Sequence, residues 1–233
     1  ANMLNNILDY DADIVGAQEI NTSWLYVMRG TGFFKTYEMV GKPRNRMTDL
    51  DNSNEYSCIF YKKDMFNVLY SDTLWLSDTP EVESRGWDEL YNCYRICLWA
   101  ILEHKASGKR FNFMNTHFGF GDKGQCDSVR LIHSYSEKIS SLPTFICGDF
   151  NMTPEKPAYA EMVKYFTDVN AVTGNDLRDT FHNYTPHIPT NEHIDYCFIN
   201  EKVKPITMKI IDELVDGKFP SDHFGIYAEI ETL

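Results

Sequence analysis

Apolar residues recur in short runs along most of the chain, and polar turns separate these runs, a pattern that predicts many strands. We expect strands over residues 14–20, 33–40, 55–62, 65–71, 73–77, 95–104, 110–118, 143–151, 193–200, 203–211 and 224–233. Polar residues dominate two further stretches, 41–54 and 78–92, which we interpret as loops.

Helical spacing of apolar residues predicts helices that fall between these strands. We expect one at the start of the chain, one over residues 22–29, one over residues 126–140, and one after Thr153. In the last of these, Thr153 is expected to cap the helix, with Pro154 in its first turn. Because strands outnumber helices and interleave with them, a layered α/β sandwich fits the pattern better than an all-β barrel.

Composition narrows the class of protein further. A chain of 233 residues that is 43% hydrophobic buries a large core, and we expect a single domain. The net charge of -12 argues against a surface that binds duplex nucleic acid, since such surfaces gather Lys and Arg. No apolar run is long enough to span a bilayer and no signal-peptide pattern opens the chain. We therefore expect no membrane partner, and the cytoplasm is the favoured compartment although the sequence leaves it open.

The cysteines favour an ordinary structural role over redox or zinc chemistry. They are scattered, mostly within apolar runs, and no Cys-x-x-Cys pair occurs among them. We expect buried, reduced thiols at Cys58, Cys93, Cys97, Cys126, Cys147 and Cys197.

Polar residues suited to chemistry stand where the strand over residues 143–151 ends. Asp149 and Asn151 are two residues apart, so in a strand they project to the same side. Gly148 removes a side chain beside them, which lets a ligand approach closely. The alternative is a simple turn, because Asp and Asn are common turn formers after a strand.

The same arrangement recurs at other predicted strand ends. Asn115 and His117 continue the face of an apolar strand, Glu19 ends another, and Asp195 and His223 stand at the starts of two more. Each alone has an ordinary reading as a turn or a structural residue. Together they are hard to explain as turns, because their strand ends would converge on one edge of a sandwich.

These residues lie in motifs that, as an ordered set, resemble those of the endonuclease/exonuclease/phosphatase superfamily, and in particular its uncharacterised bacterial members. The motifs are Gln18-Glu19, Asn115-Thr116-His117, Gly148-Asp149-Phe150-Asn151, Ile194-Asp195-Tyr196 and Ser221-Asp222-His223. The resemblance implies a four-layer α/β sandwich of two packed, mainly antiparallel sheets flanked by helices, with the site at one edge. The superfamily also begins with a strand, ending in Asn or Asp, that precedes the first helix seen here. This chain shows no such strand, so we expect residues 1–233 to form one catalytic domain that is truncated at its amino end.

The resemblance implies a role for each matching residue. Glu19 and Asp222 match acidic residues at the site of a divalent metal, and oxygen ligands suit Mg²⁺, with Mn²⁺ as the alternative. The catalytic positions are Asp149 and Asn151, which hold the attacking water and the phosphoryl oxygens, the carboxylate–histidine pair Asp195 and His223, and a second histidine, His117. Glu55 matches a residue that orients His117. Asn115 and Arg95 match substrate-binding positions, although Arg95 is equally well explained as an arginine on a solvated rim.

This set of residues predicts a metal-dependent hydrolase in which activated water attacks a phosphoester. We expect the substrate to be a small or exposed phosphoester. A nuclease acting on DNA or RNA is the alternative, and a binding module without catalysis ranks below both. We expect a monomer. The loop over residues 78–92 resembles one in uncharacterised bacterial members, where Trp75, Trp87 and Tyr91 would wall a pocket; an aromatic-anchored surface loop explains it equally well.

Overall fold

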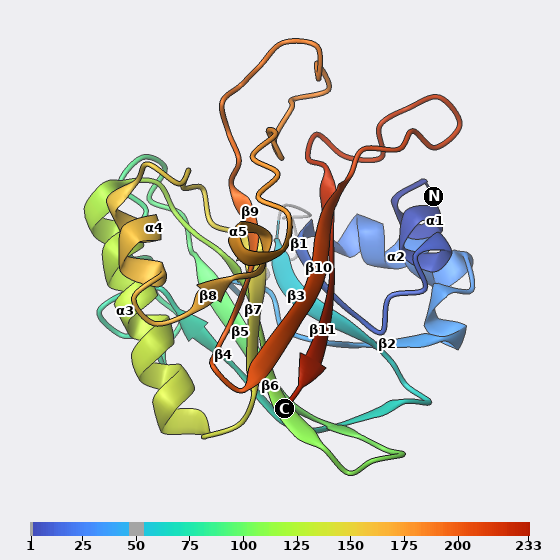
Figure 1. Ribbon diagram of the computed structural model, residues 1–233, viewed down its shortest axis with the longest axis horizontal. Helices are drawn as coiled ribbons and strands as arrows, with labels where there is room; N and C mark the ends of the chain where they lie inside the picture. Colours follow the sequence, from blue (N-terminus) through green and yellow to red (C-terminus); the bar gives the residue numbers. More distant parts are fainter. Residues whose placement is uncertain (1, 47–53) are drawn as a thin grey trace.

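The computed structural model describes residues 2–46 and 54–233, with sheets stacked between helices (Figure 1). The strands are β1 (Ile14–Ile20), β2 (Tyr37–Val40), β3 (Tyr56–Lys62), β4 (Phe66–Trp75), β5 (Ile96–His104), β6 (Arg110–His117), β7 (Thr144–Asp149), β8 (Thr167–Asp168), β9 (Asp195–Ile199), β10 (Val203–Ile211) and β11 (Gly225–Thr232). The helices are α1 (Asn2–Asp9), α2 (Thr22–Gly30), α3 (Asp122–Ile139), α4 (Pro157–Met162) and α5 (Val169–Thr173), with a 3-10 turn at Phe33–Lys35.

The largest sheet has six strands in the order β4-β5-β6-β7-β9-β8, all antiparallel neighbours except β6 and β7. One face packs against β1-β3-β2 and β10-β11 through apolar residues such as Phe113 and Ile59, and the other lies under α3 and α4. Helices α1 and α2 pack on β1-β3-β2 from outside, with Leu4 and Met28 buried between them. The predicted four-layer α/β sandwich is thereby confirmed.

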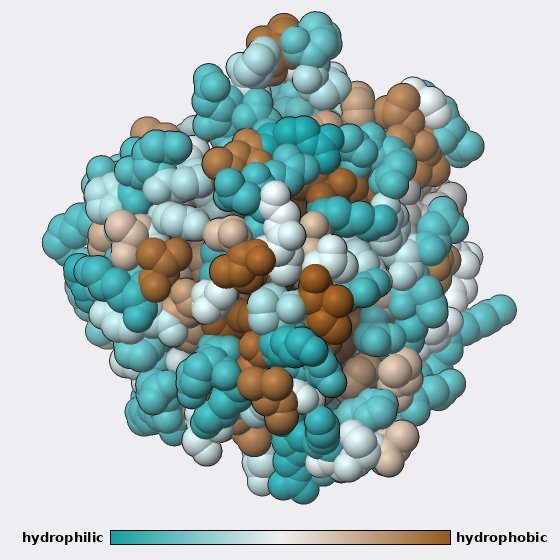
Figure 2. Space-filling view, viewed as in Figure 1, coloured by the Kyte–Doolittle hydropathy of each residue, from teal (hydrophilic) through white to brown (hydrophobic). Residues whose placement is uncertain are grey.

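The second sheet layer is divided into two separate sheets. Strand β1 pairs with β3, and β11 pairs with β10, but among the described residues no pairing joins β1 to β11. Within residues 2–46 and 54–233, one edge of β1 and one edge of β11 have no strand partner. Apolar side chains also gather near the centre of one outer face, over α5 and β10 (Figure 2).

Several predicted boundaries were wrong. Residues 33–35 form a 3-10 turn instead of the start of a strand, and α3 begins at Asp122 instead of residue 126. Within residues 65–77 the structure has one strand, β4 (Phe66–Trp75), instead of two strands. Helix α4 begins at Pro157 instead of following a Thr153 cap, because a residue before proline avoids the helical region and Lys156 is extended, with ψ of 146°. The predicted loop over residues 41–54 lies partly outside the described residues.

The structure also bears on the predictions about membrane spans and cysteines. None of the described helices is long and apolar enough to cross a membrane. All the cysteines are free thiols, but three of them, Cys93, Cys126 and Cys147, are only partly buried.

Candidate active site

Three neighbouring strand ends bring two carboxylates and a histidine into one row. The parallel register of β6 and β7 sets His117 opposite Asp149, and the antiparallel register of β7 and β9 sets Asp149 opposite Asp195. All three side chains are buried. Because adjacent strands lie about 4.8 Å apart, side chains at one register position are forced into contact distance, and His117 Nε2 lies 3.4 Å from Asp149 Oδ2.

His223, just before β11, completes this row. Its Nδ1 lies 2.9 Å from Asp195 Oδ2, and its Nε2 lies 4.0 Å from Asp149 Oδ2. Asp195 is itself held in place, because the Thr180 hydroxyl oxygen accepts hydrogen bonds from the backbone N–H groups of Ile194 and Asp195. We call His117, Asp149, Asp195 and His223 the acid–histidine row.

Burial and neighbouring charges shift the pKa values of Asp149 and His223 in this row. Burial, followed by the negative charge of Asp195, raises the pKa of Asp149 to about 7. Burial opposes the charged form of His223, but its hydrogen bond to Asp195 and the charge of that carboxylate outweigh burial and raise its pKa to about 9. At neutral pH the row therefore holds a cationic His223 beside a carboxyl poised to exchange a proton.

Glu19 lies beside this row because the backbone of β1 is irregular where it sits. The β1–β3 register shifts between Ala17 and Ile20, and Glu19 has a φ of 58°, in the left-handed region that few residues other than glycine and asparagine adopt. Its side chain is exposed, and ligand atoms of Glu19, Glu55 and His117 all lie within 4.8 Å of one another. Strained backbone at such a position is typical of functional sites.

The chemistry of Glu19, Glu55 and His117 fits a divalent metal ion. Among the described residues, Glu19 has no recorded hydrogen bond or ion pair, so its carboxylate is available. Burial raises the pKa of Glu55, partly offset by Arg44, whose Nη1 lies 2.6 Å from Glu55 Oε2. Burial and the charges of Arg95 and Arg44 hold the pKa of His117 well below its usual range, so its ring is neutral and able to act as a ligand.

Arg95 lies beside His117 and is buried instead of standing on a solvated rim. Its Nε donates to Asp88 Oδ2 at 2.9 Å, and the Asp88 side chain is fully buried. Asp88 belongs to the loop over residues 78–92, which packs against residues 119–124. In that loop Tyr91 is exposed and packs on the Phe120 ring. Trp75, at the end of β4, is buried, and its indole N–H donates to the Arg44 carbonyl.

Asn115 is brought to the junction of the two sheets instead of the site surface. Its Nδ2 donates to the carbonyls of Ala17 and Cys58 at 2.9 Å and 2.8 Å, and its Oδ1 accepts from Gln18 Nε2 at 2.6 Å. The side chain is completely buried. Its amide therefore ties β6 to β1 and β3, and supports the site from behind.

Asn151 turns back onto the carboxylate that precedes it. Its backbone N–H donates to Asp149 Oδ1 at 2.8 Å, and its Nδ2 donates to the Phe118 carbonyl at 3.0 Å. Gly148 is required by the neighbouring strand, since a Cβ there would lie 2.1 Å from the Thr116 carbonyl oxygen.

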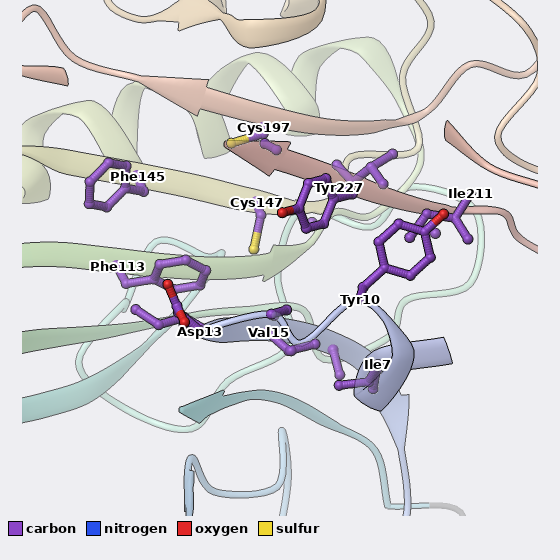
Figure 3. Close-up of a pocket in the computed structure, with 18 of the residues that line it drawn as sticks. Ile7, Tyr10, Asp13, Val15, Phe113, Phe145, Cys147, Cys197, Ile211 and Tyr227 are labelled. Atoms are coloured by element: carbon purple, nitrogen blue, oxygen red, sulfur yellow. The ribbon is translucent and has the colours of Figure 1, made fainter. Parts of the chain in front are cut away.

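Asp222 lies at the end of a cavity that runs from the site between β1 and β11. The cavity has a volume of about 850 Å³ and is also bordered by Glu19, Asp149 and His223. Farther in it is lined by apolar side chains of the six-stranded sheet, including Phe113 and Phe145 (Figure 3). In the described part of the chain, Asp222 belongs to neither of the two groups of closely spaced ligand atoms, Glu19–Glu55–His117 and Asp149–Asp195–His223.

Sequence reasoning missed several residues that shape the site. Arg44, Asp88, Gln125 and Thr180 all lie outside the motifs, and Gln125 donates to the Asn151 carbonyl at 2.7 Å. Three of them lie in or beside loops whose lengths carry no periodic signal. Arg44 stands between Lys42 and Arg46 in a polar stretch, so nothing in the sequence distinguished it from its basic neighbours.

The chain is similar in sequence and structure to known proteins. The family model described as Endonuclease/Exonuclease/phosphatase family matches residues 1–223. A solved endonuclease/exonuclease/phosphatase from Bacteroides vulgatus is 30% identical, with a TM-score of 0.87 over 99% of this chain and 89% of its own. A mannosyl-6-phosphatase from Bacteroides thetaiotaomicron VPI-5482 is 27% identical, with a TM-score of 0.85 over 98% of this chain and 89% of its own.

Among curated proteins, a CCR4-Not complex 3'-5'-exoribonuclease subunit Ccr4 from Candida albicans is 26% identical over 97% of this chain. The match covers 36% of that protein, so this chain spans less than half the length of the curated relatives it matches.

Proposed function

We propose that this chain, which belongs to the Endonuclease/Exonuclease/phosphatase family, hydrolyses a phosphoester with the help of a divalent metal ion. The proposed substrate is a small or exposed phosphoester. The observation that carries the proposal is the acid–histidine row. Its four side chains come from four separate segments of the chain, yet they lie within contact distance at one sheet edge. Members of this family are phosphoesterases and nucleases, so the reaction class follows from membership and the substrate is the proposed part.

The row supplies the proton chemistry that phosphoester hydrolysis needs. Asp149, with a pKa near 7, accepts the proton of the attacking water, because a base is most effective when its pKa lies close to the working pH. The cationic ring of His223 stabilises the negative charge that grows on the phosphoryl oxygens. Asp195 keeps this ring charged and oriented through its hydrogen bond to Nδ1.

Glu19, Glu55 and His117 would hold the metal ion, for which the exposed carboxylate of Glu19 and the neutral His117 ring are suited. When bound, Mg²⁺ or Mn²⁺ would neutralise phosphoryl charge and lower the pKa of water. Asp222, at the cavity end, would reach the substrate or the metal shell from the other side.

A small phosphoester is favoured over a nucleic acid for two reasons. The net charge of -12 repels a polyanion, and one similar solved structure is a mannosyl-6-phosphatase. A nuclease is the second candidate, since curated proteins similar to this chain are exoribonuclease subunits.

The proposal is tested by assaying the chain, together with any natural sequence that precedes residue 1, with Mg²⁺, Mn²⁺ or chelator on a sugar phosphate, p-nitrophenyl phosphate, bis(p-nitrophenyl) phosphate and a single-stranded RNA. We expect hydrolysis of the small esters that chelator abolishes and that Asp149→Asn lowers by about 10²- to 10⁴-fold, because the variant removes the base. Lys156→Gln, on the exposed surface nearby, serves as a control that retains activity. Activity that persists in chelator or in Asp149→Asn contradicts the mechanism, and cleavage of RNA alone favours the nuclease.

A further inference from the structure

Two arginine side chains, Arg44 and Arg95, line the same hollow beside His117, whose volume of about 10 Å³ is that of one water molecule at most. Arg44 comes from the segment before β3, and Arg95 immediately precedes β5. Glu55 and Tyr94 also line this hollow. Two guanidinium groups therefore flank one side of the candidate active site, opposite the side on which His223 closes the row.

Arg95 is fixed in orientation by a buried carboxylate. Its Nε donates to Asp88 Oδ2, and Asp88 Oδ1 accepts from the backbone N–H groups of Leu90 and Tyr91 at 3.2 Å and 2.9 Å. The side chains of Arg95 and Asp88 are 7% and 0% exposed. Among the described residues, only Nε of Arg95 has a recorded hydrogen bond, which leaves its two terminal nitrogens for a ligand.

Arg44 is also held rigidly, although it stands in a predicted loop. Its backbone N–H donates to the Glu55 carbonyl at 2.9 Å, and its carbonyl accepts from Trp75 Nε1 at 2.7 Å. Its side chain is 18% exposed and pairs with Glu55. Arg46, two residues on, shows the contrast, because its side chain is 92% exposed.

The charges of both arginines act on the site itself. Both hold the pKa of His117 down after burial, and Arg95 also lowers that of Asp149, against the larger effects of burial and Asp195. Arg44 has an ordinary alternative role, which is to neutralise the half-buried carboxylate of Glu55. That role needs only a positive charge, whereas binding a phosphoryl group uses the planar fork of a guanidinium.

A phosphomonoester matches two guanidinium groups better than a phosphodiester does. Its terminal phosphoryl group carries up to two negative charges and three non-bridging oxygens, and a guanidinium binds two such oxygens at once. A phosphodiester has one charge and places a second ester group where a monoester presents an oxygen. Paired arginines therefore select for the monoester.

We propose that Arg44 and Arg95 together bind the terminal phosphoryl group of the substrate and make this chain a phosphomonoesterase. The inference rests on the proposed function, because it assigns the substrate class of the same site. Arg44 is then a specificity-determining residue that contacts substrate oxygens through its guanidinium.

The test compares kcat/KM for p-nitrophenyl phosphate and bis(p-nitrophenyl) phosphate in the wild type, Arg44→Lys, Arg44→Gln and the matched control Arg46→Gln. We expect both Arg44 variants to lose about 10- to 100-fold on the monoester, the range for a charge-assisted hydrogen bond, and much less on the diester. Arg44→Lys keeps the charge beside Glu55, so a folded Arg44→Lys protein with the monoester defect separates binding from neutralisation. Arg46→Gln should match the wild type.

A binding measurement gives a second readout without turnover. In chelator, inorganic phosphate should raise the thermal unfolding midpoint of the wild type and Arg46→Gln, and should not raise that of Arg44→Lys. Equal losses on both esters, or full monoester activity in Arg44→Lys, overturn this inference while leaving a phosphoesterase in place. A wild type that hydrolyses neither ester overturns the proposed function itself, and the inference with it.

Discussion

Asp149 and His223 hold protons at pH values where the unfolded chain has released them. Their pKa values are about 7 and about 9, against ordinary values of 3.8 and 6.5. A group whose pKa is raised by folding stabilises the fold fully below its unfolded pKa, and this contribution is lost as the pH rises through its folded pKa. The Asp149 contribution is therefore mostly lost by pH 7, and that of His223 is lost between about pH 6.5 and pH 9.

We predict that the metal-free protein becomes less stable as the pH rises from 7 to 9. The unfolding midpoint should fall by several degrees in the wild type and much less in His223→Gln, which removes the titrating ring. Thermal unfolding followed by circular dichroism at closely spaced pH values measures this. His187→Gln changes an exposed histidine and should keep the wild-type slope; an unchanged slope in His223→Gln refutes the assignment.

The sequence predicted those site residues that belong to a recognisable motif. Asp149, Asp195 and His223 stand at strand ends in recognisable tripeptides, and the structure brings them together. Arg44 and Thr180 carry no such mark, because their positions depend on contacts with residues distant in the chain, Glu55 for one and Asp195 for the other. The tie formed by Asn115 was equally invisible, since its partners lie on two other strands.

At the scale of an element, strand β6 carries two buried asparagines with opposite surroundings. Asn115 uses its whole amide between the sheets, as described above. Asn112 is also completely buried, but neither atom of its amide has a recorded partner among the described residues. A buried amide without a hydrogen bond destabilises a fold, whereas one with every bond satisfied supports it.

We predict opposite effects of the same substitution at these two positions. Asn115→Leu should lower the free energy of unfolding by about 2–4 kcal/mol, because it leaves Ala17, Cys58 and Gln18 without partners. Asn112→Leu, of similar volume, should leave stability unchanged or raise it. Urea unfolding of both variants decides the matter: equal destabilisation means that Asn112 has partners as good as those of Asn115.

Element types followed from periodicity more reliably than element ends did. The apolar run over residues 110–118 predicted β6 closely, although both faces of this strand are buried from Phe111 to His117. The start of α4 was missed because the cap signal at Thr153 and the restriction imposed by Pro157 act within four residues of each other, and the proline prevails.

At the scale of the whole molecule, the hydrophobic pattern did not predict the order of the strands in the sheets. Alternation shows which residues face a core, but β9 lies between β7 and β8 through contacts that no local signal encodes. The family resemblance supplied the layers, and it did not show that β1-β3-β2 and β10-β11 form separate sheets. That division leaves alternate N–H and C=O groups along the free edges of β1 and β11 without a strand partner among the described residues.

The open edge of β11 has a consequence for how the protein responds to heat. His223 leads directly into β11, so one of the four residues of the acid–histidine row depends on a hairpin paired along one side only among the described residues. Elements with few partners open locally before the rest of a fold unfolds. Local opening of β10 and β11 would withdraw His223 from Asp195 while the six-stranded sheet stays intact.

We therefore predict that activity is lost at a lower temperature than secondary structure, at constant saturating Mg²⁺. Hydrogen–deuterium exchange should show faster exchange in residues 203–211 and 225–232 than in residues 110–117 and 144–149, while coincident loss of activity and circular dichroism would contradict this. The upper working temperature of residues 1–233 is then set by one hairpin, and added contacts along the edge of β11 would raise that temperature even if they left the melting of the main sheet unchanged.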